Sequence, residues 1–108
     1  MAYKIAQGDQ RFVPFVLTLN GAAVSPEMLQ ELEVCAEDQV FRKLMTKGEV
    51  SFNENRQVWE FLLTQQETFG LDSGEYSVQV RPKFRDGTTI QWAIGTVCVS
   101  DSHSEAVI

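Results

Sequence analysis

The chain has 108 residues, of which 44% are hydrophobic, and its formal net charge is −6. This length is typical of one domain, and the hydrophobic fraction is enough for a core without a stabilising metal. The excess of acidic residues disfavours nonspecific binding to phosphate backbones, so we do not expect nucleic acid as a partner. No apolar run approaches the about 18 residues needed to cross a bilayer, and no secretion signal is recognisable. We therefore expect neither a membrane contact nor secretion by a signal peptide.

Apolar residues alternate with polar ones over most of the chain, which is the pattern of half-buried β-strands. In chain order the alternating stretches are RFVPFVLTLN (11–20), LQELEVCA (29–36), VWEFLL (58–63), EYSVQVRPKF (75–84) and TTIQWAIG (88–95). Turn signals separate them at Asn20-Gly21, Lys47-Gly48, 53–56, Ser73-Gly74 and Asp86-Gly87. This spacing predicts an all-β, mostly antiparallel sandwich of about seven strands over residues 1–100, followed by a C-terminal tail over residues 101–108.

The N-terminal half carries two local signals that interrupt the strand pattern. Pro14 lacks an N–H group, so its strand should lie at a sheet edge or be interrupted there. Phe12 and Val16 make the second face of that strand apolar as well. The segment Ser25-Pro26-Glu27 has the N-cap and first-turn residues of a helix, with room for one turn. It is the only segment that we expect to be helical.

The two cysteines, Cys35 and Cys98, invite comparison with the disulfide that joins the sheets of antibody domains. Each cysteine, however, alternates with the more apolar residues of its own strand and therefore faces away from the core. The chain also has no signal for an oxidising compartment. We predict two free thiols.

The Asp86-Gly87 turn determines the register of the hairpin formed by residues 75–95. A two-residue loop would set Lys83 beside Ile90, which places a charged outer residue next to an apolar inner one. A three-residue loop over 85–87 instead puts the apolar residues on one face, with the pairs Phe84–Thr88, Pro82–Ile90, Val80–Trp92 and Val78–Ile94. We predict this second loop, with Gly87 in the left-handed region as a G1 bulge.

The apolar parity of the last strand changes after Ile94, and Gly95 lies at the change. A β-bulge at Gly95-Thr96 would restore the inward face, because glycine tolerates the backbone that a bulge requires. Alternatively, the strand crosses from one sheet to the other at this point. Both alternatives bend the strand.

The stretch LDSGEY, residues 71–76, precedes the strand 75–84. A tyrosine at the start of a sandwich strand, after leucine and glycine, is typical of a tyrosine corner, in which the hydroxyl bonds to backbone a few residues upstream. We predict that Tyr76 closes such a crossing, that Gly74 gives the backbone freedom, and that Leu71 plugs the end of the core. Residues 64–68 would form the crossing loop.

The residues of catalytic and metal sites are sparse and scattered in this sequence. The one histidine, His103, lies in the tail, and the cysteines lack a CxxC spacing. The acids Glu31, Glu33 and Glu37 share the outward face of one strand, where such residues are usually solvated. Glu67 has no second carboxylate beside it. We expect no enzyme, no metal and no cofactor.

The most site-like feature is a row of polar and cationic residues on the outward face of the last hairpin. Alternate residues of a strand are about 7 Å apart, so these side chains form a continuous line. We call it the basic stripe; it comprises Gln79, Arg81, Lys83 and Arg85, with Thr89 and Gln91 opposite. Two interpretations stay open: contact with an acidic protein surface or charged glycan, and a solvated face balanced by Glu31 and Glu33.

Several short segments together resemble a family of phage proteins. They are Gln7-Gly8-Asp9 before a long strand, Leu63-Thr64 with Thr68, the Leu71/Gly74/Tyr76 triplet, and the Asp86-Gly87 turn. The chain is in these respects similar to small structural proteins of phages and prophages of Gram-positive bacteria, and to the N-terminal immunoglobulin-like domain of phage baseplate upper proteins.

This resemblance implies an immunoglobulin-like sandwich and a virion-associated structural or adaptor role in the tail or baseplate. The partners would be other virion proteins or a second copy of the chain, in the virion or the host cytoplasm.

The alternative to this role is a small carbohydrate-binding sandwich, which needs exposed aromatic platforms. Trp59 and Trp92 share parity with core residues and should be buried, which leaves Phe12 and Phe69 as candidates. We expect Phe69 to pack under the corner. The tail over residues 101–108 is expected to be disordered, the alternative being that Ala106-Val107-Ile108 docks on a neighbouring subunit.

Overall fold

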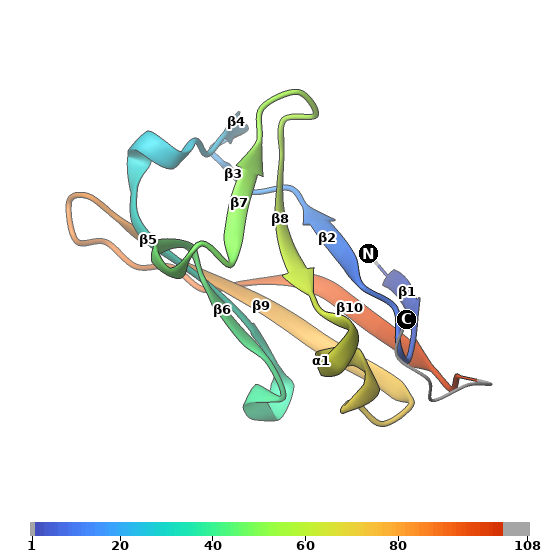
Figure 1. Ribbon diagram of the computed structural model, residues 1–108. Helices are drawn as coiled ribbons and strands as arrows, with labels where there is room; N and C mark the ends of the chain where they lie inside the picture. Colours follow the sequence, from blue (N-terminus) through green and yellow to red (C-terminus); the bar gives the residue numbers. More distant parts are fainter. Residues whose placement is uncertain (1, 103–108) are drawn as a thin grey trace.

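The computed structural model describes residues 2–102 (Figure 1). Within this range the chain forms ten strands, three short turns of 3-10 type and one short α-helix. The strands are β1 (Ala2–Ala6), β2 (Arg11–Phe15), β3 (Thr18–Leu19), β4 (Ala22–Ala23), β5 (Leu29–Ala36), β6 (Arg42–Leu44), β7 (Val50–Asn53), β8 (Val58–Leu63), β9 (Gly74–Phe84) and β10 (Trp92–Ser100). The helical elements are η1 (Pro26–Met28), η2 (Glu37–Gln39), η3 (Met45–Lys47) and α1 (Gln65–Phe69).

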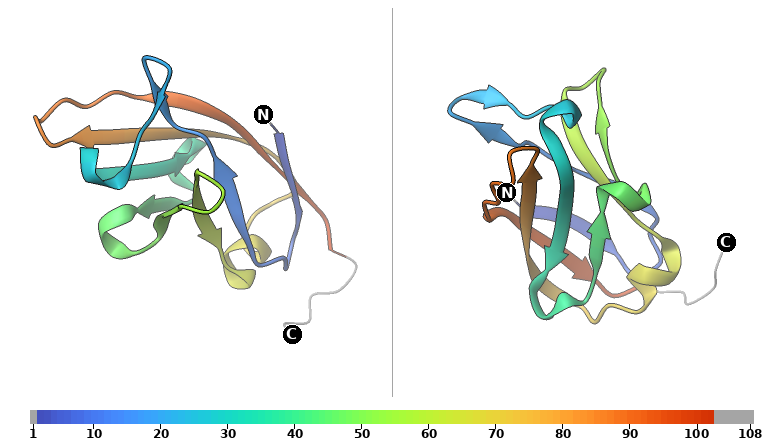
Figure 2. Two further views of the ribbon diagram at one scale, coloured as in Figure 1. Left: turned by 90° about the horizontal axis from the view of Figure 1, so that it is seen from above. Right: turned by 90° about the vertical axis from the view of Figure 1, so that its left-hand side faces the viewer.

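The strands build two facing sheets and a small hairpin (Figures 1 and 2). The five-stranded sheet, here called sheet A, has the order β1-β10-β9-β5-β6, and the three-stranded sheet B has the order β2-β8-β7. The strands β3 and β4 form the separate hairpin. In the described residues every strand pair is antiparallel except β1 with β10, which is parallel. The predicted all-β, mostly antiparallel sandwich is confirmed.

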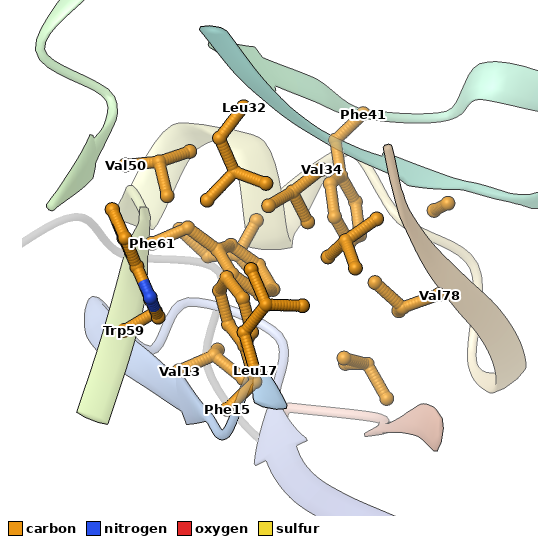
Figure 3. Packing of buried hydrophobic residues seen from close by; sticks show 14 of the residues in the cluster. Val13, Phe15, Leu17, Leu32, Val34, Phe41, Val50, Trp59, Phe61 and Val78 are labelled. Atoms are coloured by element: carbon orange, nitrogen blue, oxygen red, sulfur yellow. The ribbon is translucent and has the colours of Figure 1, made fainter. Parts of the chain in front are cut away.

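The core lies between the inward faces of the two sheets, as Figure 3 shows. Phe61, at the centre of sheet B, contacts Phe15 and Phe41, with ring centroids 6.1 and 5.6 Å apart. Trp59 is buried as predicted, and its indole N–H donates to the carbonyl of Val24 at 3.0 Å. A buried indole needs such a partner. The expectation that Trp92 is also buried was wrong, because Trp92 is half-buried at the start of β10.

The hairpin between β9 and β10 has the predicted three-residue loop. The amide of Phe84 donates to the carbonyl of Thr88 at 2.8 Å, and the amide of Gly87 donates to the carbonyl of Phe84 at 2.9 Å. Gly87 has φ of 91°, as the G1 bulge requires. Trp92 consequently pairs with Val80, which keeps the apolar residues of the hairpin on the inner face.

The bulge in β10 lies one residue earlier than predicted. The register shifts between Ala93 and Gly95, so Val78 pairs with Gly95 and the expected Val78–Ile94 pair was wrong. Ile94 is the extra residue, and Gly95, with φ of 136°, takes the position opposite Val78. The strand then continues in sheet A to Ser100, so the parity change reflects a bulge and not a crossing between sheets.

The two local signals in the N-terminal half, Pro14 and the Ser25-Pro26-Glu27 segment, both mark features of the structure. β2 is an edge strand of sheet B, as Pro14 predicted, and the alternating stretch 11–20 is interrupted after Phe15. The expected helical turn forms over Pro26–Met28, but the Ser25 side chain makes no capping hydrogen bond. Pro26 alone therefore marks this turn, with its preset φ at the first position.

The short helix α1 was not predicted, and the expectation of a plain crossing loop over residues 64–68 was wrong. The Thr64 hydroxyl accepts a hydrogen bond from the amide of Glu67 at 3.2 Å, and the Glu67 carboxylate accepts one from the amide of Thr64 at 3.0 Å. This reciprocal capping box satisfies two amides that the first turn of a helix leaves unpaired. The Thr-x-x-Glu spacing in LTQQET is its signature, and it was available in the sequence.

The crossing into β9 contains the backbone contact expected of Tyr76. Its hydroxyl donates to the carbonyl of Asp72 at 2.6 Å, four residues upstream. Leu71 is buried in the core beneath this corner, and Gly74 begins β9. The LDSGEY stretch is thus a structural connection between the end of α1 and sheet A.

Tyr76→Phe should lower the free energy of unfolding by about 1 kcal/mol, the usual net value of one hydrogen bond. The ring stays in place and only the bond to the Asp72 carbonyl is lost. Urea unfolding followed by far-UV circular dichroism measures the change. An unaltered midpoint would show that the hydroxyl does not fasten the corner.

Candidate functional site

The basic stripe lies on the outer face of sheet A, as its parity predicted. Its side chains are exposed, and the Gln91 side-chain amide donates to the Gln79 side-chain oxygen across the hairpin. The guanidinium of Arg85 turns toward η1, where Nε donates to the carbonyl of Glu27 at 2.7 Å. Thr89 lies opposite Lys83. The structure therefore brings the predicted residues onto one surface but engages several of them in contacts within the chain.

Acidic residues of β5 oppose the cations of the stripe directly. Arg81 and Glu33 are paired in register, with Nη2 and Oε1 3.0 Å apart, and Arg42 of β6 contacts the same carboxylate from the other side. Lys83 is paired in register with Glu31. The stripe is thus part of a face of mixed charge. This agrees with the interpretation of the stripe as a solvated face that Glu31 and Glu33 balance.

The Glu31 carboxylate is fixed by hydrogen bonds. Burial raises its pKa, but the hydroxyl of Thr46 and the backbone amides of Leu32 and Thr46 donate to it and hold its pKa below the ordinary value. Glu31 is therefore ionised at neutral pH and unsuited to act as a general acid.

Two shallow hollows open on the same outer face around Cys35. One of about 140 Å³ is lined by Glu33, Gln79, Arg81 and Gln91, and the other of about 170 Å³ by Glu37 and Ser77, with Cys35 and Gln79 shared by both. Cys35 and Cys98 are both free thiols and half-buried. The backbone amide of Ser77 donates to the Glu37 carboxylate at 3.0 Å, so this acid too is held within the chain.

A third hollow, which is apolar, lies where the edges of the two sheets meet, and we call it the seam groove. It has a volume of about 330 Å³ and is lined by residues 15–18 on the side of sheet B and by Trp92, Ala93 and Ile94 on the side of sheet A. Phe15 and Leu17 are buried in its floor, whereas Val16 is 64% exposed on its rim. The lining contains no charged side chain.

On the side of sheet A the seam groove lies along an unpaired strand edge, and on the side of sheet B it meets the end of β2 at Phe15. Among the described residues β2 pairs only with β8, and residues 92–95 of β10 pair only with β9. The strand β1 pairs with β10 from Thr96 onward, so it covers only the other half of the seam. There the hydroxyl of Tyr3 donates to the carbonyl of Phe12 at 3.3 Å, which ties β1 to the edge of β2. The groove lies along the half of the seam that β1 does not cover.

Two apolar side chains of the stretch 11–20 are exposed, and Val16 is the one that borders the groove. Val16 is 64% exposed, and Phe12, on the outer face of β2, is 55% exposed beside Leu62 of β8. Exposed apolar residues that gather near a concave, uncharged groove are a common mark of a protein contact surface. Sequence reasoning noticed that Phe12 and Val16 made both faces of their strand apolar, but it did not predict the groove.

Three of the four segments that carried the family resemblance come together at the opposite end of the sandwich, whereas Asp86-Gly87 forms the tip of the β9–β10 hairpin. The amide of Gly8 donates to the Thr68 hydroxyl at 3.0 Å, and that hydroxyl donates to the carbonyl of Asp9 at 2.7 Å. The side chain of Phe69 lies over Gly8 so closely that a Cβ there would be 2.7 Å from the ring. Phe69 therefore packs at the corner, as expected. These contacts are structural and form no open site.

Glu67, for which the sequence indicated no partner carboxylate, holds a buried lysine. Both carboxylate oxygens contact Nζ of Lys43, at 2.7 and 2.5 Å, and Lys43 is 5% exposed on the inner face of β6. Burial raises the pKa of Glu67, but Lys43 and the capping bonds from Thr64 keep it below its ordinary value. The ionised Glu67 carboxylate thus joins α1 to Lys43 of sheet A.

The described residues contain neither a metal cluster nor a membrane helix. No group of three His, Cys, Asp or Glu side chains within residues 2–102 is arranged to hold a metal ion. In the same range no helix is long and apolar enough to span a bilayer. His103 and the apolar residues 106–108 lie outside the described part of the chain.

Comparisons with protein-family models, with curated proteins and with solved structures found no match to this chain.

Proposed function

We propose that this chain is a noncatalytic, immunoglobulin-like module of a phage virion that acts as a structural or adaptor component of the tail or baseplate. The observation that carries the proposal is the seam groove, an uncharged hollow beside the unpaired edge of β10 with Val16 exposed at its rim. Such a surface suits another polypeptide, because a strand can complete both the hydrogen bonding and the apolar packing.

The strand order supports the immunoglobulin-like part of the proposal. Sheet B, with the order β2-β8-β7, corresponds to strands B, E and D of a variable-type domain, and β10-β9-β5-β6 corresponds to G, F, C and C′. The Tyr76–Asp72 hydrogen bond lies where the tyrosine corner of such domains is found, near the start of the strand that corresponds to F. The similarity of the quoted sequence segments to phage proteins supports the virion role.

Density-gradient purification of particles from the encoding host, followed by immunodetection of the chain, tests the virion role. We expect the protein to migrate with the particles and to stay with them after high-salt washing. A protein that is expressed but remains at the top of the gradient would contradict the proposal. The seam groove would then need a partner outside the virion.

The double substitution Arg81→Glu and Lys83→Glu should leave incorporation into particles unchanged. It places like charges opposite Glu33 and Glu31, so we expect a stability loss of about 1 kcal/mol or less, as for exposed ion pairs. Thermal unfolding and the particle assay together measure both effects. Loss of incorporation by a folded variant would identify the basic stripe as the contact surface instead of the seam groove.

A carbohydrate-binding role is the alternative, and half-exposed Trp92 in the seam groove is the observation that favours it. Sugar sites combine an aromatic platform with several polar side chains that read the hydroxyls. The groove supplies one side-chain hydroxyl, on Thr18, among otherwise apolar residues. This composition fits an apolar polypeptide better. A glycan array with a clear signal that Trp92→Ala abolishes would establish the alternative.

A further inference from the structure

We propose that the seam groove binds residues Ala106-Val107-Ile108 of a second copy of this chain, so that copies associate head to tail. This inference rests on the proposed function, in which the module works through protein contacts, and it names a second copy of the chain as the partner. The observations that carry it are the open edge of β10, the chemistry of the groove, and the reach of the chain beyond Ser102.

The groove has the form of a missing strand. On the side away from β9, residues 92–95 of β10 have no partner within residues 2–102, because β1 begins its pairing at Thr96. A strand placed there would continue the position of β1 along the sheet and lie against Phe15 and Val16, since Leu17 and Thr18 already pair with Val24 and Ala23. Backbone groups at such an edge provide affinity, and the neighbouring hollow provides specificity for the side chains.

The segment 106–108 matches the groove in chemistry. Valine and isoleucine favour extended backbone and pack well on a half-buried strand surface. The floor of Phe15 and Leu17 and the walls of Val16, Trp92 and Ile94 present apolar surface without a charge. Residues 101–105 of the same tail are polar or acidic, so within the tail the apolar triplet is the part suited to this groove.

Reach excludes the groove of the same molecule. The chain leaves sheet A beyond Ser100, and the amide of Ser102 donates to the Gln7 side chain at the turn between β1 and β2. From Ser100 back to Trp92 is about 26 Å along β10, at about 3.3 Å per residue. The six residues after Ser102 span at most about 20 Å when fully extended, and they would also have to reverse direction. All three apolar residues can therefore occupy only the groove of a neighbour.

Association of this kind is heterologous, since the groove of one copy receives the tail of another. Two variants of the full chain each disrupt one side of this contact, either the groove or the tail segment. Val16→Glu places a charge on the groove rim, and Val107→Glu places one in the tail segment. Two matched controls carry the same charge elsewhere. Val40→Glu, at a valine that is 44% exposed between η2 and β6, is the control for Val16→Glu, and Ser104→Glu is the control for Val107→Glu.

The experiment is sedimentation and multi-angle light scattering at concentrations up to about 1 mM, where even a millimolar Kd gives substantial association. We expect the wild type and both controls to associate, and Val16→Glu and Val107→Glu each to remain at the 12.2 kDa monomer mass. An equal mixture of the two monomeric variants should form a heterodimer, because the tail of one and the groove of the other are intact.

Three results would overturn the inference: a wild type that stays monomeric throughout, a Val107→Glu variant that associates like the wild type, or a mixture that does not form the heterodimer. The second would indicate pairing of groove with groove. None of these bears on the virion role, which the particle assay tests separately. A chain that associates as expected but is absent from particles would leave this inference standing and contradict the proposed function.

Discussion

Phe61→Ala should lower the free energy of unfolding by about 3–5 kcal/mol, the usual range for a large-to-small change in a packed core. The Phe61 ring is 1% exposed and packs between Phe15 of β2 and Phe41 before β6. Removing the Phe61 ring leaves a cavity between Phe15 and Phe41, where aromatic side chains from the two sheets meet. Since small domains have a total stability of about 5–15 kcal/mol, the variant should be close to unfolding.

Urea unfolding at 25 °C measures this effect, and Phe12→Ala is its matched control. Phe12 lies on the same sheet but is 55% exposed, so its truncation should change stability by about 0.5 kcal/mol or less. Equal losses for the two substitutions would contradict the burial assigned to Phe61 and the packing of sheet B on sheet A.

Glu67→Gln should cost about 2–4 kcal/mol, because it leaves the Lys43 ammonium buried without its counter-charge. Lys43 is 7% exposed in its side chain, and both Glu67 oxygens contact its Nζ. The Glu67 side chain is 35% exposed, so water compensates for part of the loss, and we place the value below the upper end for fully buried pairs. Thermal and urea unfolding at pH 7 check the value.

Lys43→Met separates the charge from the packing. It fills the same volume without a charge, and replacing a buried charge by a matched apolar side chain is often neutral or stabilising. We expect a change of about 1 kcal/mol or less, since the remaining Glu67 carboxylate is partly solvated and still caps α1. A Lys43→Met variant as unstable as Glu67→Gln would contradict this account of the pair.

The Glu67 effect should also depend on pH. The pKa of Glu67 is lowered in the fold from its ordinary value of 4.5, so the native state favours the ionised form. The contribution of Glu67 is therefore complete above pH 4.5 and is lost as the pH falls through the lowered pKa of the folded state. The stability difference between wild type and Glu67→Gln should shrink in that acidic range, which unfolding curves from pH 7 downward measure.

The sequence was informative wherever a local pattern determines the structure. Parity and the Asp86-Gly87 turn specified the hairpin register, because a two-residue loop would have mixed charged and apolar residues on one face. Pro14 identified an edge strand by its missing N–H. Capping chemistry was equally local, and the Thr64–Glu67 spacing would have revealed α1 had it been read as a capping box.

What the sequence did not predict depends on which strands become neighbours. The position of the bulge at Ile94 depends on how Val78 meets Gly95, and parity alone could not separate that position from the next one. The burial of Lys43 follows from its place opposite α1, which is not local in sequence. The seam groove exists because β1 pairs with only part of β10, a tertiary fact that no alternation of residues encodes.

The candidate surfaces follow the same division. The outward side chains of the basic stripe were predicted in position, and their contacts with Glu33 and Glu27 emerged only once β5 and η1 were placed beside them. The exposed apolar residues Phe12 and Val16 were visible in the sequence as an excess on the wrong face of a strand. The structure shows that Val16 borders the seam groove, which the sequence pattern did not predict.

Hydrogen–deuterium exchange of the full chain at low and high concentration tests most directly whether the seam groove is the contact surface. We predict that the amides of residues 16–18 and 92–95 become protected as the concentration rises, that the basic stripe over residues 79–85 does not gain protection, and that Val16→Glu abolishes the effect while Val40→Glu retains it. Concentration-dependent protection confined to the outer face of sheet A, or protection at the groove that survives Val16→Glu, would contradict the account.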